Sequence, residues 1–515
     1  MKAQDYNISP EKFVFHATDG NLHDTKLETK PVTYFRDALN RFAKNKASIL
    51  AFCIIVVLVL FAVLMPMFSP YTVAYHDAYY KFVLPRNPIF YDMGIHFWDG
   101  GAEKEVNKAT FDLYRGIEEE TGRTVIMTEP EITTEEYMGK VKELFTFRLD
   151  TYNAVGVQYA YLSTAEYQAL QRYQDEKNIQ VIFPITDSNL RPEAVQDKDN
   201  ANIWYQTKLG AGNKTEIIYD GNGNFIPIYM ADDGTDMYTS KMYFEGQNKQ
   251  YNYAQKMDGD LWMVRVDYRE YYIYQHYLAN DGITEPLFLL GTTDSGQDIL
   301  TCLSSGARFS FILALIVAAV NLTVGAIYGS IEGYYGGKTD LIMERIVDLL
   351  ASIPFMIVIT LLKYHLNASH ILILFISFFL TGWTGMAGRT RMQFYRYKNQ
   401  EYVLVARTLG AKDSRIMFKH IFPNAIGTLI TGSVLVIPSV IFSETSLTYL
   451  GIIDLNTGDM TSVGTLLAKG QNYLFTYPHM ILFPAIFISL LMLSFNLFGN
   501  GLRDAFNPSL RGTEE

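Results

Sequence analysis

The chain has 515 residues, of which 49% are hydrophobic and only 19% charged, a low charged fraction for a soluble protein of this length. The net charge of −11 is unevenly distributed, because 36 acidic and 20 basic residues lie between positions 71 and 306 and the remainder is slightly basic. No basic face stands out that would suit a phosphate backbone, so the composition argues against a nucleic-acid-binding protein.

Six apolar runs divide the chain. The first, residues 47–67, is uncharged and long enough to cross a bilayer, and it lies too far from the start to be a removed signal peptide. Further runs fall at about 309–331, 342–362, 369–387, 425–450 and 479–499. The pattern predicts six membrane-spanning helices, with a polar block of domain size between the first and the second.

Basic residues predict the orientation. They are concentrated before the first span and in residues 388–421, whereas the segments near Lys363 and over 452–478 hold few. The positive-inside rule therefore places both termini in the cytoplasm and the acidic block, residues 71–305, outside the cell.

The segment before the first span, residues 33–46, has helical apolar spacing. Phe35, Ala38, Leu39 and Phe42 share one face, and basic residues share the other. Such a helix either lies along the inner membrane surface or docks on protein, and the pattern fits both. Residues 1–30 are polar and unpatterned, which indicates a loose cytoplasmic arm.

The outer block reads as α+β. Ser163 and Glu166 form a capping box that predicts a helix to about 177, and Thr133 with Glu136 predicts another. Residues 180–184 are strand-like, and residues 215–230 predict a hairpin around DGNGN. The dense Tyr and Phe residues favour an aromatic core over a peptide-binding surface. Cys53 and Cys302 lie in or beside spans, so no disulfide is expected and this block depends on its core alone.

Ionisable and helix-breaking residues inside the spans are candidates for the transport pathway or the helix bundle. Asp348 and Glu444 are costly in lipid and should face protein or a pathway. A salt bridge near the cytoplasmic end is an equal alternative for Asp348, and a packing cluster of hydroxyls is the alternative for Glu444. Pro354 interrupts the third span, and Gly382 and Gly385 interrupt the fourth. The candidate set is Asp348, Pro354, Trp383, Glu444 and Thr445.

Recognisable catalytic and cofactor motifs are missing from the sequence. The run from Gly333 to Thr339 resembles a phosphate loop but has Glu332 where the first glycine is needed. The Asp220 loop has calcium-like spacing, yet Phe225 and Ala231 replace the required glycine and glutamate. We therefore expect no ATP site, no metal, no cofactor and no catalytic residue in this chain.

The segment EYVLVARTLGAKDSRIMFKHIFPN, residues 401–424, is the most informative. It is basic and amphipathic and lies between spans, and it resembles the coupling motif of ABC-importer permeases. Gly410 and Pro423 hold the expected positions, Ala406 keeps the second alanine of E-A-A, and His420 and Phe422 depart from the pattern. The resemblance implies that ATPase subunits push on residues Ala406, Leu409, Gly410, Ala411, Asp413, Ile416 and Pro423, with a short helix around 409–418.

Further stretches resemble the C-type permease of oligopeptide and dipeptide ABC importers in the same order along the chain. They are residues 289–315, 332–354, 380–391, 443–452 and 495–511. The resemblance implies an all-α type I ABC importer permease fold of six transmembrane helices, into which an extracellular α+β domain is inserted. The expected boundaries are 1–46 for the arm, 47–70 for the first span, 71–288 for the insert, 289–505 for the core with its coupling helix at 401–423, and 506–515 for the tail.

The resemblance implies one of two permease subunits of an ATP-driven peptide importer in a bacterial cell membrane. Its partners would be a second permease, two cytoplasmic ATPases that bind ATP and Mg²⁺, and an extracellular substrate-binding protein. Relatives in this family also carry nickel chelates, glutathione or opines, which remain alternatives. A membrane-anchored extracellular sensor is the alternative of another class. The insert would organise docking of the binding protein, act as a spacer, or contact the partner permease.

Overall fold

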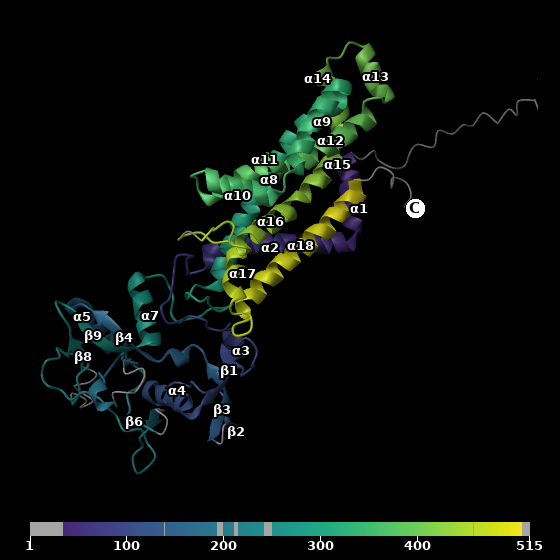
Figure 1. Cartoon of the computed structure of the whole chain (residues 1–515). Helices are drawn as coiled ribbons and strands as arrows, with labels where there is room; N and C mark the ends of the chain where they lie inside the picture. The colour runs from purple at the N-terminus through teal and green to yellow at the C-terminus, as the bar shows by residue number, and fades with distance from the viewer. Residues whose placement is uncertain are drawn as a thin grey trace, which may run out of the picture.

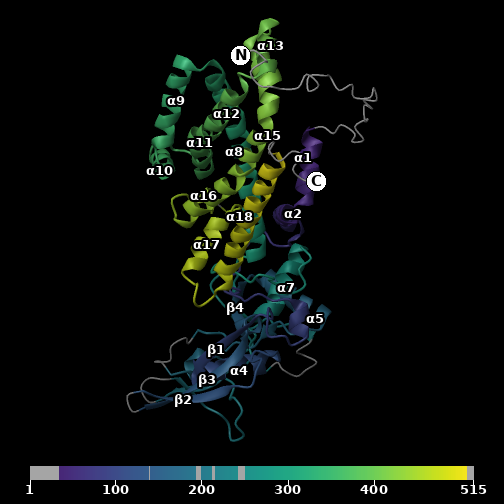
Figure 2. The same ribbon diagram turned by 90° about the vertical axis from the view of Figure 1, so that its right-hand side faces the viewer.

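The computed structural model describes residues 34–137, 140–192, 199–210, 215–241, 250–456 and 458–506. Expectations for the arm before Tyr34 and the tail after Phe506 lie outside these residues. The molecule has an elongated helical bundle at one end and an α+β unit at the other (Figure 1). The α+β unit is formed by the long segment between the first two spans. Figure 2 shows the same separation after a quarter turn, with α13 and the strands at opposite ends.

The bundle contains the apolar runs of the sequence. Its helices are α1 (Tyr34–Lys44), α2 (Lys46–Phe68), α8 (Ile299–Tyr335), α9 (Gly337–Ser352), α10 (Phe355–His365), α11 (His370–Gly382), α12 (Thr384–Tyr397), α13 (Glu401–Thr408), α14 (Asp413–Arg415), α15 (Phe422–Val434), α16 (Val436–Tyr449), α17 (Val463–Gln471) and α18 (His479–Phe506). A π-helical turn, Ile416–Ile421, links α14 to α15. By length and composition five helices or continuous helix runs of the described chain can cross a membrane, or six if α9 and α10 together form one.

The predicted third span is the broken one. Helices α9 and α10 meet at an angle of 78°, with Pro354 as the residue before α10. Proline lacks an N–H and disfavours helix in the residue before it, so the break falls at Ile353 and Pro354, as the sequence indicates.

Helix α1 docks on protein. Ala38 and Phe42 are buried, and the Phe42 ring meets Phe498 of α18 edge-on at 5.4 Å between centroids. Leu39, expected on the same face, is 65% exposed. Helix α1 therefore packs on α18 through Phe42, and its place along the inner membrane surface stays a prediction.

The α+β unit contains three small sheets. Strands β1 (Gly101–Asn107), β3 (Lys140–Asp150) and β2 (Glu131–Tyr137) pair antiparallel in the order β1-β3-β2. The second sheet has β4 (Val157–Leu162), β9 (Trp262–Asp267) and β5 (Ile182–Phe183), with β8 (Ala254–Lys256) also on β9, and β6 (Thr207–Leu209) pairs with β7 (Thr215–Ile217). Helices α3 (Pro88–Asp92), α4 (Lys108–Thr121), α5 (Thr164–Lys177) and α7 (Tyr268–Ala279) complete it, with short 3₁₀ turns at Asn153–Val155 and Ser188–Leu190.

Local predictions in this unit have mixed outcomes. The Ser163 capping box is confirmed, with Glu166 accepting from the Ser163 N–H at 2.8 Å. The helix expected after Thr133 is wrong: Thr133 lies in β2 opposite Leu144, because Ile132, Thr133 and Thr134 are β-branched and favour a strand.

The DGNGN turn is confirmed, since Tyr219 bridges Phe225 and the Asp220 N–H donates to the Asn224 carbonyl at 2.9 Å. The arms of that hairpin diverge, because β7 pairs with β6 and Pro227 bridges Tyr205. The residues around this turn therefore belong to two pairings instead of one long hairpin.

Aromatic side chains form much of the interior, as expected. One cluster holds Tyr71, Tyr80, Tyr152, Tyr272 and Phe288, all buried, and it joins the start of the insert to its end. Cys53 and Cys302 are both free. The unit is therefore stabilised by burial of aromatic area and hydrogen bonds.

Candidate functional site

The predicted coupling segment lies at the end of the bundle farthest from the α+β unit (Figure 1). Helices α13 and α14 are separated by four residues, 409–412, that are not helical. The single helix expected around 409–418 is therefore replaced by a turn followed by a new helix at Asp413. Gly410 is the physical reason, because it interrupts the helix with a left-handed residue.

The turn has a defined geometry. The Gly410 N–H donates to the Arg407 carbonyl at 3.0 Å, and the Ala411 N–H donates to the Ala406 carbonyl at 3.1 Å. Gly410 has φ +78°, and a Cβ there would meet nothing within 4 Å. The backbone conformation, and not lack of space, therefore requires glycine. Leu409 beside it is 82% exposed, so an apolar side chain is presented at the tip.

A buried hydrophobic cluster connects this tip to the helical bundle. Val403 of α13, Phe394 of α12 and Ile416 and Ile421 of the π-helical turn have no exposed surface, and Tyr334 of α8 packs with them. The cluster fixes α13 to three other parts of the bundle. A displacement of the tip must therefore move these helices or break the cluster.

Three contacts of polar side chains stabilise the same region. The Tyr334 hydroxyl donates to Asp413 Oδ1 at 2.6 Å, and the Arg407 guanidinium lies 5.7 Å from the centre of the Tyr334 ring. The Lys398 ammonium donates to the Gly333 carbonyl at 2.9 Å. Tyr334 thus connects the C-terminal end of α8 to both sides of the Gly410 turn.

Helices α8 and α12 approach each other closely through glycines. A Cβ on Gly329 would lie 2.1 Å from the Ala387 carbonyl oxygen, and one on Gly333 would lie 2.7 Å from the Phe394 Cβ. Gly325 faces Met386 in the same way, at 2.7 Å. Glycines at four-residue spacing allow backbones to pack this tightly in membranes, so α8 and α12 form a rigid pair beneath the tip.

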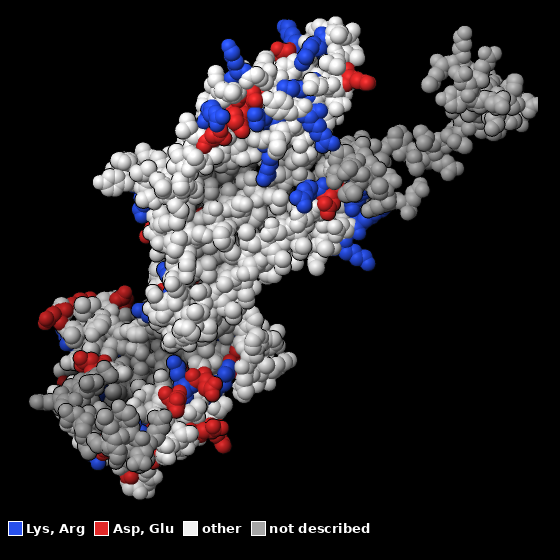
Figure 3. Space-filling model, turned by 45° about the vertical axis from the view of Figure 1, so that its right-hand side comes forward, with Lys and Arg blue, Asp and Glu red and all other residues white. Residues whose placement is uncertain are grey.

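An arginine with three carboxylates joins α9 to that pair. Arg391 of α12 makes bonds of 2.6 and 3.0 Å to Asp340, and it lies 3.3 Å from Glu332 and 3.4 Å from Glu344. Figure 3 shows charged side chains gathered at this end and at the opposite one, with a wide band of uncharged surface between them. The charge distribution matches a chain whose middle lies in a bilayer.

Some of the predicted coupling residues are buried and others are exposed. Ala406 and Ile416 are buried, Ala411 is half-buried, and Leu409, Gly410, Asp413 and Pro423 are exposed. Pro423 lies directly after the π-helical turn, inside the continuous helical run Asp413–Tyr449, so the residue that lacks an N–H coincides with the change from π- to α-helix. All seven lie in the segment 406–423, and their role in coupling stays a prediction.

The pathway candidates are dispersed. Glu444 is fully buried and accepts from the Ser310 hydroxyl at 2.7 Å, with Thr445 buried beside it. Trp383 packs on Tyr328 at 4.7 Å between ring centres, and Pro354 lies at the 78° bend. Asp348 is half exposed and pairs with Arg345 at 3.0 Å. The contacts of Glu444 and Asp348 match the packing and salt-bridge alternatives.

The residues predicted from the sequence do not include Tyr334, Phe394, Val403 or the three glycines that support the tip. The glycine spacing at 325, 329 and 333 was a readable signal for close helix packing. The contact between Tyr334 and Asp413 joins residues 79 positions apart, and nothing in the sequence indicates it.

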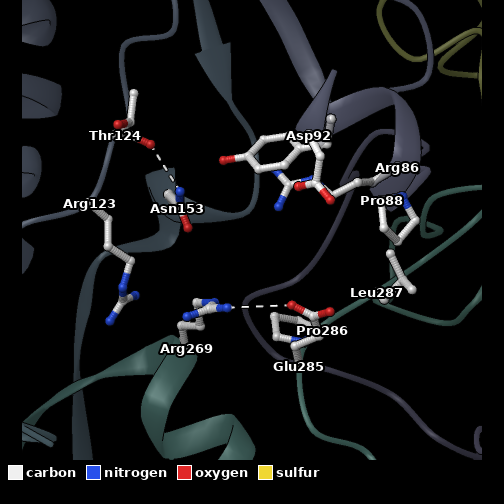
Figure 4. Close-up of a pocket in the computed structure, with 11 residues that line it drawn as sticks. Arg86, Pro88, Asp92, Arg123, Thr124, Asn153, Arg269, Glu285, Pro286 and Leu287 are labelled. Carbon is white, nitrogen blue, oxygen red and sulfur yellow. Dashed lines mark hydrogen bonds and ion pairs between the residues drawn. The ribbon is translucent and has the colours of Figure 1, made fainter. Parts of the chain in front are cut away.

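The α+β unit contains a cavity of about 340 Å³ between α3, α7 and the segment 285–287 (Figure 4). Three arginines line it, and each has a carboxylate partner: Arg86 binds Asp150, Arg123 binds Asp267, and Arg269 lies 3.6 Å from Glu285. Burial raises the pKa of Asp267 and Arg123 opposes that rise. The guanidinium charges are already matched, so the cavity does not form an anion site.

Comparisons with known proteins decide the family. The family described as binding-protein-dependent transport system inner membrane component matches residues 321–512, and the N-terminal TM domain of oligopeptide transport permease C matches residues 33–85. The oligopeptide transport system permease protein OppC of Bacillus subtilis is 43% identical over 221 residues, 43% of this chain and 72% of that relative. The chain belongs to this family of transport permeases.

Other relatives agree. The dipeptide transport system permease protein DppC of Bacillus subtilis is 38% identical over 222 residues, covering 43% of this chain and 68% of the relative. OppC of Escherichia coli is 37% identical over 222 residues, covering 43% and 72%. A solved chain of the MetNI methionine ABC transporter aligns with TM-score 0.33 and 14% identity over 40% of this chain and 96% of that one.

Membership settles the class of protein. This permease is a multi-pass membrane transport component and not an enzyme, and the fold class expected from the sequence, a helical ABC permease with a separate α+β region, is confirmed. Neither family match includes residues 86–320. The α+β unit therefore falls between the two matched parts.

Proposed function

We propose that this permease is the C-type subunit of an ATP-driven peptide importer. Its relatives are named for oligopeptide and dipeptide transport, which supports peptides as the cargo. It forms the transport path with a second permease, two cytoplasmic ATPases supply ATP hydrolysis with Mg²⁺, and an extracellular binding protein delivers substrate. The observation that carries the proposal is the exposed Leu409–Gly410 tip, which is fixed to the core of the bundle.

The mechanism follows from the contacts of the tip. An ATPase that grips Leu409 pushes on α13, whose Val403 is locked against Phe394 and Ile416. Phe394 belongs to α12, which the glycine contacts hold against α8 over Gly325 to Gly333. Movement of the tip therefore rotates α8 and α12 as one body, the kind of rigid-body change that alternates access across a membrane.

The charge distribution supports the orientation. Basic residues at the α12–α14 end favour the cytoplasm, and the acidic block favours the outside. In this arrangement both termini are cytoplasmic, the tip meets the ATPases and the α+β unit lies outside the cell.

We place the insertion between Arg86 and Pro286, later than residue 71. The oligopeptide permease match runs to residue 85, and the Arg86 N–H donates to the Phe288 carbonyl at 3.1 Å, so the two ends of the insert lie side by side. Residues before Arg86 pack on the permease: the Val83 N–H donates to Thr292 Oγ1 at 2.9 Å, and the Gln297 amide donates to the Val73 carbonyl at 2.7 Å. The segment before the insert and the segment after it therefore already pack against each other as part of the permease, and the insert projects from this pair.

Gly410→Val tests the coupling role. A β-branched residue at φ +78° is strained by about 1–3 kcal/mol, which distorts the tip and not the buried cluster. We expect peptide uptake to be lost while membrane insertion and abundance stay normal. Gly451→Val is the matched control, because Gly451 has φ +70° and equal space at the opposite end of the bundle. Normal uptake by Gly410→Val, or equal loss in both variants, would refute the proposal.

A further inference from the structure

The α+β unit carries an exposed apolar face on residues 88–98, PIFYDMGIHFW. Ile89, Met93, Ile95 and Phe97 are 60%, 68%, 42% and 64% exposed. Ile89 and Met93 lie one helical turn apart at α3, so their side chains share a side. Four large apolar residues exposed within nine positions are unusual on a surface that faces only water.

Two polar residues of this stretch line the neighbouring cavity. Asp92 and Tyr91 line the cavity of Figure 4, where Tyr91 also packs on the Arg86 guanidinium at 4.4 Å. His96 lies 3.6 Å from Asp99, and its side chain is 62% exposed. The exposed face of this stretch therefore consists of the four apolar side chains and the His96 ring, while Tyr91 and Asp92 line the cavity.

Aromatic contacts join this face to a membrane helix. Trp98 stacks on Phe483 of α18 at 5.5 Å between centroids, Phe97 meets Trp98 at 5.6 Å, and Phe90 meets Phe97 at 6.3 Å. The Trp98 backbone has φ +61°, a conformation rare for a large side chain, so this contact is maintained against local strain. Figure 1 shows α3 directly beside the end of α18.

The position of Phe483 along α18 indicates how deep in the bilayer the apolar face of residues 88–98 lies. The apolar part of α18 runs from Met480 to Gly499, and about 20 residues at 1.5 Å each match the ~30 Å hydrocarbon core of a bilayer. Phe483 therefore lies just inside the outer edge of that core, and Trp98 beside it lies at the interface, where Trp is preferred. Exposed Leu482, Ile486, Leu490, Leu493 and Leu497 continue the apolar surface along α18.

We infer that residues 88–98 form a membrane-interface anchor, which seats the insert in the outer lipid headgroup layer. The occupant of the face is lipid, because the exposed residues continue the apolar surface of a spanning helix at interfacial depth. This anchor holds the insert in one orientation against the bilayer, independently of the substrate that is transported.

Spin-label accessibility tests the anchor. In a Cys53→Ser, Cys302→Ala background, single Met93→Cys and Phe97→Cys variants carry a nitroxide in the assembled importer in lipid nanodiscs. Ile132→Cys is the matched control, since Ile132 is 60% exposed in β2, away from the bundle. We expect severalfold more collisions with oxygen than with a water-soluble nickel chelate at 93 and 97, and the reverse at 132. Nickel accessibility at 93 and 97 equal to that at 132 would overturn the proposal, as would shielding from both reagents, which would mean that protein covers the face.

Discussion

The Tyr334 hydroxyl donates a 2.6 Å hydrogen bond to Asp413, the first residue of the helix that follows the Gly410 turn. Tyr334 is the next-to-last residue of the spanning helix α8 and Asp413 begins the next helical run, so this bond connects the exposed tip to the interior of the bundle. Tyr335 lies 3.5 Å from the other oxygen of the same carboxylate and is exposed. The two neighbouring tyrosines therefore offer a matched comparison.

Tyr334→Phe should weaken coupling without unfolding the permease. The ring and its packing remain, while a hydrogen bond to a charged group, of about 1.5–3 kcal/mol, is lost. We expect reduced uptake and reduced substrate-stimulated ATP hydrolysis in reconstituted importer. Tyr335→Phe should change neither rate, and equal effects of the two substitutions would argue against a specific role of the Tyr334 bond.

Gly329→Ala should destabilise the helix pair α8–α12. Its methyl group would lie 2.1 Å from the Ala387 carbonyl oxygen, a backbone atom that cannot move alone. Overpacking of this kind costs about 1–3 kcal/mol. Thermal unfolding in detergent should occur at a lower temperature than in the parent. Gly388→Ala, where the added methyl meets nothing within 4 Å, should unfold as the parent does.

Deletion of the insert should preserve uptake only if residues up to Arg86 are kept. Because Arg86 and Phe288 are hydrogen-bonded neighbours, joining residue 86 to residue 286 through a short Gly-Ser linker leaves the contacts of Val73 and Val83 intact. Removal of residues 72–286 deletes these contacts. We expect the first deletion to retain measurable uptake and the second to lose stable insertion. Uptake that is abolished by the first deletion, with normal insertion, would mean that the insert is essential for transport.

Acid should weaken the contact between Asp99 and Arg148. Although burial opposes it, hydrogen bonds from Arg148 and the Gly101 N–H lower the pKa of Asp99 below its ordinary value of 3.8. The folded chain therefore holds this carboxylate ionised more readily than the unfolded chain, and the stabilisation is present above pH 3.8 and is lost as the pH falls through the lowered value.

Asp99→Asn tests this linkage. Its cost in unfolding free energy should be about 2 kcal/mol at pH 7 and should shrink as the pH falls below 3.8, where the parent also loses the charge. Glu216→Gln is the control, because Glu216 and Lys208 are both half exposed and such pairs contribute about 0–1 kcal/mol. A cost for Asp99→Asn that does not change with pH would contradict the assignment.

The sequence predicted the bundle better than the insert. Apolar runs of about bilayer length locate the spans, because such segments are stable in lipid, and Pro354 marks the break in the third. Ser163 and Glu166 begin a helix by local hydrogen bonds alone, which a sequence displays directly.

The features that the sequence did not predict depend on contacts between residues that are far apart in the chain. Thr133 and Glu136 have the spacing of a cap, yet pairing of β2 with β3 prevails there. Asp413 is recognisable as part of the coupling segment, but its partner Tyr334 lies in a distant helix. The stacking of Trp98 on Phe483 likewise joins two segments that no spacing relates.

In the proposed mechanism the Leu409 tip receives force from a partner ATPase, and cross-linking tests this contact directly. In the Cys53→Ser, Cys302→Ala background, Leu409→Cys carries a photoactivatable cross-linker in membranes that contain the whole importer, and Phe475→Cys, 98% exposed in the α17–α18 loop, is the control. We expect Leu409 to cross-link to a nucleotide-binding subunit with a yield that changes when ATP is added, and Phe475 never to reach that subunit. Absence of any ATPase adduct at Leu409 in an importer that transports normally would contradict this mechanism.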